Sequence, residues 1–147
     1  MYATEHGPSG GQFGVAQDEV NYILAGYNYG WPEIIGDQIQ NEMENPIIQS
    51  GTSETWAPSG ATFVNGGLWN NSLVFTGLRG QSLYRLVLDT NDPTRVLTFE
   101  EYFSGQFGRL RDVIQGPDGA LYMITNNTDG RGAPREGDDR LIRVTVQ

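Results

Sequence analysis

The sequence contains no cysteine, no lysine, one histidine and no long apolar run. Without cysteine, disulfide bonds and thiolate metal sites are excluded. No apolar stretch approaches the ~20 residues that a membrane-spanning helix needs, and "MYATEHGPSG" lacks the basic and apolar regions of a signal peptide. We therefore expect no membrane insertion, and we expect that any targeting peptide is missing or was removed.

Positive charge is absent from the first half of the chain. Residues 1–78 contain eight carboxylates and neither Lys nor Arg, whereas residues 79–147 contain ten carboxylates and nine arginines. This distribution argues against a nucleic-acid partner, because neutralising phosphates requires basic patches. It suits a cation bound by the first half and a small anion bound by the second, although a solvated acidic surface explains any single carboxylate equally well.

The sequence is instead rich in short β-branched or aromatic runs, which are bounded by Gly, Pro, Asn and Asp. A chain of 147 residues that is 37% hydrophobic is long enough to bury the core of one domain. The runs predict strands near residues 2–6, 18–24, 61–65, 72–78, 82–88, 95–102, 109–115, 120–125 and 140–146. The segment 30–54 is predicted to be a long irregular connection, and such loops are usually functional.

Two stretches repeat the same plan of turn, apolar strand, loop and a second strand with a central Arg. They are "NNSLVFTGLRGQSLYRLVLD" and "DGALYMITNN…DDRLIRVTV", so that Leu73 matches Leu121 and Arg85 matches Arg143. Recurrence of this kind is typical of β-propeller blades, whereas a sandwich would not predict it. At ~45 residues per blade the chain holds about three blades, fewer than the roughly four to eight of a closed ring. We expect an all-β fold that is part of a propeller.

A pair of arginines, Arg109 and Arg111, stands one residue apart in "GRLRDV". If this stretch is a strand, both side chains point to the same face. Two like charges side by side in an acidic chain indicate either a solvated face or a site for an anion. The acidic stretch 135–139, beside Arg131, is expected to form a solvated, ion-paired loop, and we assign it no chemistry.

Three longer stretches carry a resemblance to a known family: "EHGPSG…DEVNYILAGYNYGWP", "WAPSGATFV…LVFTGLRGQSLYRL" and "GRLRDVIQGPDGALYMITNN". In this order and spacing they resemble the C-terminal half of the glucose/sorbosone dehydrogenase family, soluble six-bladed propellers that use pyrroloquinoline quinone. The resemblance implies a partial blade with calcium-binding loops at 1–50, one blade at 51–105 and the last blade at 106–147. It also implies a periplasmic or secreted parent protein.

The resemblance assigns cofactor-binding roles to four residues. Arg109 and Arg111 match the two arginines of the family that bind the quinone, and Arg79 falls where members carry a basic ligand. Thr55, just before "WAPSG", is a weaker candidate. Guanidinium groups suit this ligand because pyrroloquinoline quinone is a planar tricarboxylate, and charge-assisted hydrogen bonds to carboxylates are often bidentate.

Calcium is the second cofactor that the resemblance implies. The backbone carbonyls at the Gly7–Pro8 step match those that hold a calcium ion beside the quinone in the family. Calcium accepts six to eight oxygen ligands without strict geometry, which suits carbonyl oxygens. A second calcium site would use the Glu19 carboxylate and the Tyr29 carbonyl, with Asp18 as an alternative carboxylate.

No catalytic residue is expected in this chain. His6 is the one histidine, but the catalytic base of the family lies in an early blade, so His6 is expected to be structural or to support the calcium-binding turn. The resemblance implies oxidation of an aldose or related alcohol by hydride transfer to calcium-bound pyrroloquinoline quinone, with a small-molecule sugar as substrate. Alone, without the half that carries the base, the chain should be inactive.

Two other functions stay open. A non-catalytic binding or assembly module is one, because two copies of three blades would close a ring and bury both open sides; the missing N-terminal half would do the same. A propeller lactonase, which also holds calcium centrally, ranks third. It would favour carboxylate and Asn ligands over the arginines of this chain.

Overall fold

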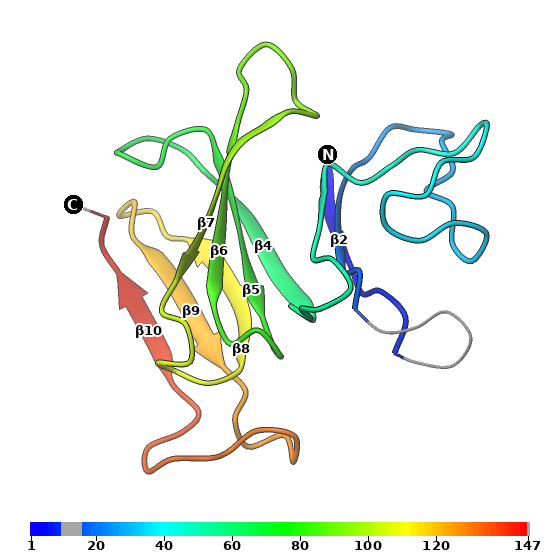
Figure 1. Ribbon diagram of the computed structural model, residues 1–147. Coiled ribbons are helices and arrows are strands. Elements are labelled where there is room, and N and C mark those ends of the chain that lie inside the picture. Colours follow the sequence, from blue (N-terminus) through cyan, green and yellow to red (C-terminus); the bar gives the residue numbers. More distant parts are fainter. Residues whose placement is uncertain (10–15, 147) are drawn as a thin grey trace.

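The computed structural model describes residues 1–9 and 16–146, and Figure 1 shows their strands arranged as small antiparallel sheets. The first sheet contains β1 (Tyr2–Glu5), β2 (Glu19–Tyr22) and β3 (Ile48–Gln49). The middle sheet contains β4 (Pro58–Val64), β5 (Ser72–Gly77), β6 (Leu83–Leu88) and β7 (Val96–Tyr102). The last sheet contains β8 (Leu110–Gln115), β9 (Leu121–Thr125) and β10 (Leu141–Val144).

Each of the nine predicted strand regions contains an observed strand, so the all-β prediction is confirmed for the described residues. Only β3 was not predicted; it has two residues, lies inside the predicted irregular segment 30–54, and pairs antiparallel with β2. The described residues contain no helix that is long and apolar enough to cross a lipid bilayer.

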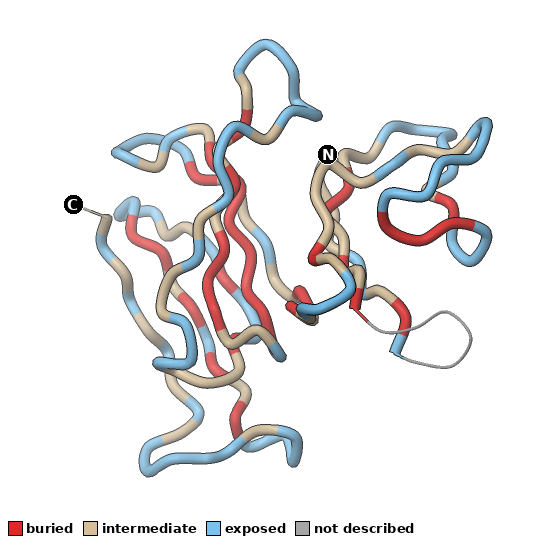
Figure 2. The backbone as a smooth tube through the Cα atoms, in the orientation of Figure 1, coloured by how far each residue is buried: buried red, intermediate tan, exposed pale blue. Residues whose placement is uncertain are grey.

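Two apolar layers hold the three sheets together. The layer between the first and middle sheets is built from buried side chains that include Val20, Leu73 and Phe75. The layer between the middle and last sheets includes Val74 and Leu121. Because side chains alternate along a strand, β5 contributes to both layers, and all of its residues are buried. Figure 2 shows this concentration of buried residues along the centre of the middle sheet.

The internal repeat corresponds to equivalent strands in the middle and last sheets. Leu73 and Leu121 lie in the second strand of their sheets, β5 and β9, whereas Arg85 and Arg143 lie in the third, β6 and β10. This is the arrangement that the propeller prediction requires: one blade plan used twice, with the blades packed face to face.

The repeat also identifies an uncovered surface. Leu83 begins β6, pairs with Thr76 of β5, and is fully buried against the last sheet. Its equivalent Leu141 begins β10 and pairs with Ile124 of β9, but it is 68% exposed. Ile114 and Ile124 are also exposed, at 57% and 41%. The outward face of the last sheet is therefore apolar at the positions where the middle sheet packs on its neighbour.

Candidate functional site

A cavity of about 290 Å³ lies where the ends of several strands meet. Its walls come from the segment after β1, the segments before β2, β4 and β8, and the segments after β5 and β9. In antiparallel sheets these points all lie at the same end, which brings residues far apart in the sequence together. The cavity is lined by five of the predicted site residues: Gly7, Pro8, Thr55, Arg79 and Arg109.

Asp18 fixes the backbone on one side of this cavity. Its Oδ1 accepts the backbone N–H of Gly7 and its Oδ2 accepts that of Ala57, each at 2.9 Å, and only 2% of the residue is exposed. The Asp18 N–H donates to the Ser50 hydroxyl at 3.0 Å. Both carboxylate oxygens therefore have backbone donors and tie the segments preceding β2 and β4 to the Gly7–Pro8 turn.

Position 7 has no room for a side chain, so it requires glycine. A Cβ atom there would lie 1.9 Å from the Ala16 carbonyl oxygen and 2.6 Å from the Gln17 backbone. His6 is engaged next to it, with Nε2 at 2.7 Å from the carbonyl oxygen of Pro58. Gly7 and Pro8 both line the cavity, so that their backbone carbonyls lie beside it.

Arg109 is the best-anchored cation of the cavity. Its Nε and Nη2 contact Asp129 Oδ2 at 3.2 and 2.9 Å, and its Nη1 donates to the Leu78 carbonyl at 3.3 Å. Its side chain is 12% exposed. The pKa of Asp129 is lowered, first by the backbone N–H of Arg131 and then by the side chain of Arg109. The Arg109 guanidinium is thus held at the cavity by a carboxylate that stays ionised.

Arg111 does not line the cavity with Arg109. The ladder between β8 and β9 has an irregularity between Leu110 and Asp112, so the strict alternation that would place both arginines on one face is broken. The Arg111 carbonyl accepts the Ser59 hydroxyl at 2.6 Å, while the residue itself is exposed. A cofactor-binding role for Arg111 stays a prediction.

The predicted second calcium site lies outside this cavity. Glu19 accepts the Gly36 N–H at 2.8 Å and the Asn21 amide at 3.2 Å, and its pKa is raised by burial, with Glu5 among the further causes. The side-chain oxygen of Asn21 is buried without a hydrogen-bond partner. The Tyr29 hydroxyl donates to the Tyr22 carbonyl at 2.8 Å.

Across residues 1–9 and 16–146, no group of three or more His, Cys, Asp or Glu side chains could hold a metal ion. A cation at Glu19 would therefore need carbonyl and amide oxygens as well as carboxylates. The buried, unpartnered oxygen of Asn21 is a donor of that kind. Calcium binding by Glu19 and Tyr29 stays a prediction.

Arg131 lines the cavity and was missed by the sequence reasoning, which assigned it to an ion-paired surface loop. The signal that could have found it is the sequence "TDGRG", in which Asp129 accepts the N–H groups of Arg131 and Gly132 and so turns the chain back toward Arg109. The cavity is thus lined by three arginines in a protein whose net charge is −9.

The sequence and the fold were compared with known proteins. Residues 1–143 match the model of the family described as Glucose / Sorbosone dehydrogenase. The chain belongs to this family. A chain of an oxidoreductase (glucose dehydrogenase) from Thermus thermophilus is 45% identical with a TM-score of 0.85; the match covers 98% of this chain and 41% of that one.

Two further relatives agree with this family assignment. The PQQ-bound aldose sugar dehydrogenase of Streptomyces coelicolor is 35% identical with a TM-score of 0.80, and the match covers 97% of this chain and 38% of that structure. The aldose sugar dehydrogenase YliI of Escherichia coli K12 is 32% identical over 88% of this chain and 36% of its own length. This member of the glucose/sorbosone dehydrogenase family therefore spans about two fifths of its relatives, and the predicted partial propeller is confirmed.

Proposed function

We propose that this chain is the cofactor-binding part of a quinone-dependent sugar dehydrogenase, which oxidises an aldose or related alcohol by hydride transfer to calcium-bound pyrroloquinoline quinone. The observation that carries the proposal is the cavity, which brings the backbone of Gly7 and Pro8 together with arginines from separate sheets. A small cavity with several convergent cations is the expected site for a compact polyanion.

The residues of the cavity fit such a ligand. Arg79 and Arg109 would bind its carboxylates, and Thr55 would donate a hydroxyl beside them. Arg109 is held in place by Asp129 before any ligand arrives, so little side-chain entropy would be lost on binding. Arg79 is exposed, and its backbone N–H is fixed by the Trp56 carbonyl at 3.1 Å.

Calcium fits the opposite wall. Gly7 and Pro8 would offer carbonyl oxygens, which are the ligands that calcium prefers, and Asp18 orients them by holding the Gly7 N–H. The buried Asp18 carboxylate also places a negative charge near that wall. When bound, the quinone with its calcium ion would supply the hydride acceptor, and the protein would supply position and charge.

The chain's own contribution is to bind and orient. Backbone carbonyls on one side and guanidiniums on the other would fix the plane of a flat anion, and the buried Leu78 would cover part of it from water. The general base and most sugar contacts would come from the remaining blades, as the length of the relatives suggests. A periplasmic or secreted location is part of the same proposal.

A chimera tests this function directly. The segment of the Thermus relative that matches this chain would be replaced by residues 1–147, and the product supplied with calcium and the quinone. We expect sugar-dependent reduction of a dye, which is lost when Arg109→Ala is introduced while thermal unfolding stays cooperative. A folded chimera that binds no quinone would contradict the proposal.

A second candidate, an assembly module, is favoured by the outward face of the last sheet. Leu141 and Ile124 are exposed, whereas the equivalent positions of the middle sheet, Leu83 and Thr76, are fully buried, so a further sheet belongs there. A second copy of the chain would supply one, as would the remaining blades of a longer protein. The mass of the protein in solution separates these cases, because a second copy would give a dimer.

A further inference from the structure

The loop between β9 and β10 brings a second cation beside Arg109. Asp129 uses one oxygen for the Arg109 guanidinium, at 2.9 and 3.2 Å, and the other for the backbone N–H groups of Arg131 and Gly132, at 2.9 and 3.2 Å. The Asn126 side-chain amide also donates to Asp129, at 3.0 Å. One carboxylate therefore positions the side chain of Arg109 and the main chain of Arg131 together.

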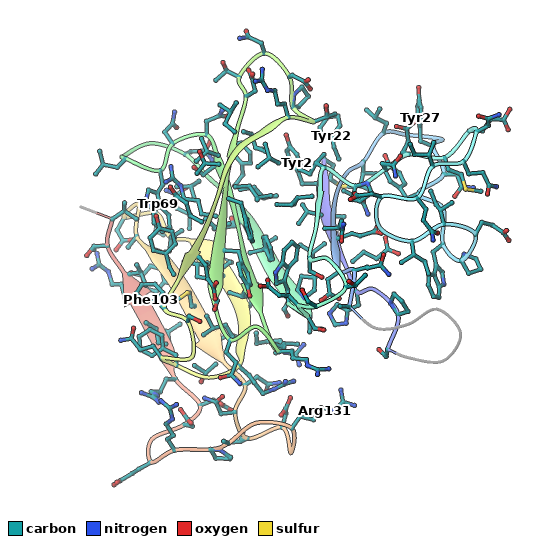
Figure 3. The ribbon with its side chains drawn as sticks, viewed as in Figure 1. Tyr2, Tyr22, Tyr27, Trp69, Phe103 and Arg131 are labelled. Carbon is teal, nitrogen blue, oxygen red and sulfur yellow. The ribbon has the colours of Figure 1, made fainter. Side chains whose placement is uncertain are left out.

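Two glycines shape the turn that carries Arg131. Gly130 has a φ of 81°, a left-handed conformation that glycine adopts without strain. At Gly132 a Cβ atom would lie 2.5 Å from the Asn127 carbonyl oxygen, so the loop is packed against the segment that follows β9. Figure 3 shows the Arg131 side chain extending from this loop on the side that faces the first sheet.

The guanidinium of Arg131 differs from that of Arg109 in its charge balance. Among the described residues, no carboxylate pairs with the Arg131 or Arg79 side chain, whereas Arg109 has Asp129. Five of the nine arginines have an acidic partner in the described structure: Arg85, Arg95, Arg109, Arg140 and Arg143. Of the other four, Arg79 and Arg131 line the cavity, whereas Arg111 and Arg135 do not. The cavity therefore retains two guanidiniums without a protein counter-ion, together with one that is fixed.

We infer that Arg131 is a third guanidinium of the anion site and binds a carboxylate of the same quinone as Arg79 and Arg109. This inference rests on the proposed function and extends it to a residue on a different loop. Three cations from the segments after β5, before β8 and after β9 would match three carboxylates around one planar ligand.

Calorimetric titration of the full chain with pyrroloquinoline quinone, in calcium and at two ionic strengths, tests the inference. Arg131→Gln keeps the backbone N–H that Asp129 holds, so the loop should stay in place. Arg95→Gln is the matched control, because it removes the same charge from an exposed site beyond the cavity. Circular dichroism and thermal unfolding would show that both variants are folded.

Arg131→Gln should lower the affinity for the quinone about tenfold or more and should reduce the salt dependence of binding. Arg95→Gln should change the affinity less than about twofold. Arg131→Lys should recover part of the loss, since it restores the charge without the planar fork. Equal affinities for the two Gln variants would overturn the role of Arg131 and leave the proposed function standing. A wild-type chain that binds no quinone would overturn both.

Discussion

Asp18 and Gly7 line the same cavity and are hydrogen-bonded to each other: the buried carboxylate accepts the Gly7 N–H at 2.9 Å. The other carboxylate oxygen accepts the Ala57 N–H at the same distance. These two hydrogen bonds connect the first sheet to the start of β4. The geometry of the candidate calcium ligands, Gly7 and Pro8, therefore depends on a residue that does not need to contact calcium.

Replacing Asp18 by Asn should destabilise the protein. An amide presents an NH₂ group to one of the two backbone donors, and a buried N–H left without an acceptor costs about 1–3 kcal/mol. Urea unfolding should show a loss of that size for Asp18→Asn. The control Asp37→Asn changes an exposed carboxylate that contacts Gln49 and should cost under ~0.5 kcal/mol. Equal losses of stability in the two variants would show that the two hydrogen bonds to Asp18 do not stabilise the fold.

The buried hydroxyl of Tyr84 should make the folded protein less stable at high pH. Its burial, with Glu101 as the next cause, raises its pKa from 10.0 to about 12. The unfolded chain releases this proton near pH 10, so stability is fully present below pH 10 and is lost as pH rises toward 12, by up to about 3 kcal/mol. Tyr84→Phe should flatten the fall between pH 10 and 12.

Denaturant unfolding at successive pH values measures that effect. Tyr27→Phe, at a tyrosine that is 56% exposed, is the matched control and should leave the wild-type pH profile unchanged. If wild-type protein and Tyr84→Phe lose stability in parallel above pH 10, the buried hydroxyl is not the group responsible.

The loop between β9 and β10 should be the acid-sensitive part of the molecule. The pKa of Asp139 is lowered, chiefly by the Thr128 hydroxyl, and that of Asp138 is lowered, chiefly by the Arg135 N–H. Lowered folded-state pKa values stabilise the protein above the ordinary pKa near 4, and this stability is lost as pH falls through the folded values. Hydrogen exchange should therefore show residues 126–140 opening first as pH falls from 6 to 3.

Asp139→Asn provides the test within that loop. The variant should be less stable at pH 6, because Asn127 and Thr128 lose a charged acceptor, but it should lose less stability on acidification than the wild type. An identical acid profile for both proteins would exclude Asp139 as a source of the acid sensitivity.

From the exposed apolar face of the last sheet we predict that another sheet packs on it, either from a second copy of the chain or from further blades. Leu141→Ser should remove apolar area from that face with little effect on the fold, since Leu141 is 68% exposed. Analytical ultracentrifugation should show a wild-type dimer if a second copy covers the face, and a monomer for Leu141→Ser. Leu97→Ser is the control at a leucine of the middle sheet that is 52% exposed. A monodisperse wild-type monomer would contradict assembly through two copies.

The fold was largely predictable because every strand except β3 falls in a short β-branched or aromatic run that is bounded by turn residues. β3 was not, because a pair of residues has no period; Ile48 and Gln49 become a strand only by pairing with Val20 and Glu19. The repeat that matched Leu73 with Leu121 was informative because equivalent blades bury equivalent positions.

The residues that line the cavity were predictable where family motifs carry them and less so elsewhere, and their cofactor-binding roles stay predictions. Gly7, Arg79 and Arg109 meet in one cavity although they come from different sheets. Arg111 does not join them, because the irregularity beside Leu110 interrupts the alternation on which the pairing depended. Arg131 was overlooked because charge alone suggested an ion-paired loop, and only the turn made by Asp129 shows where its side chain goes.

The central claim is that the cavity binds pyrroloquinoline quinone through its arginines, and one titration measures this most directly. Calorimetry with the quinone and calcium should give one site per chain for the wild type, with affinity weakened by about 2 kcal/mol or more in Arg109→Ala. Arg95→Ala should bind like the wild type. Absence of binding by the wild type, or equal affinity in Arg109→Ala, would contradict the account.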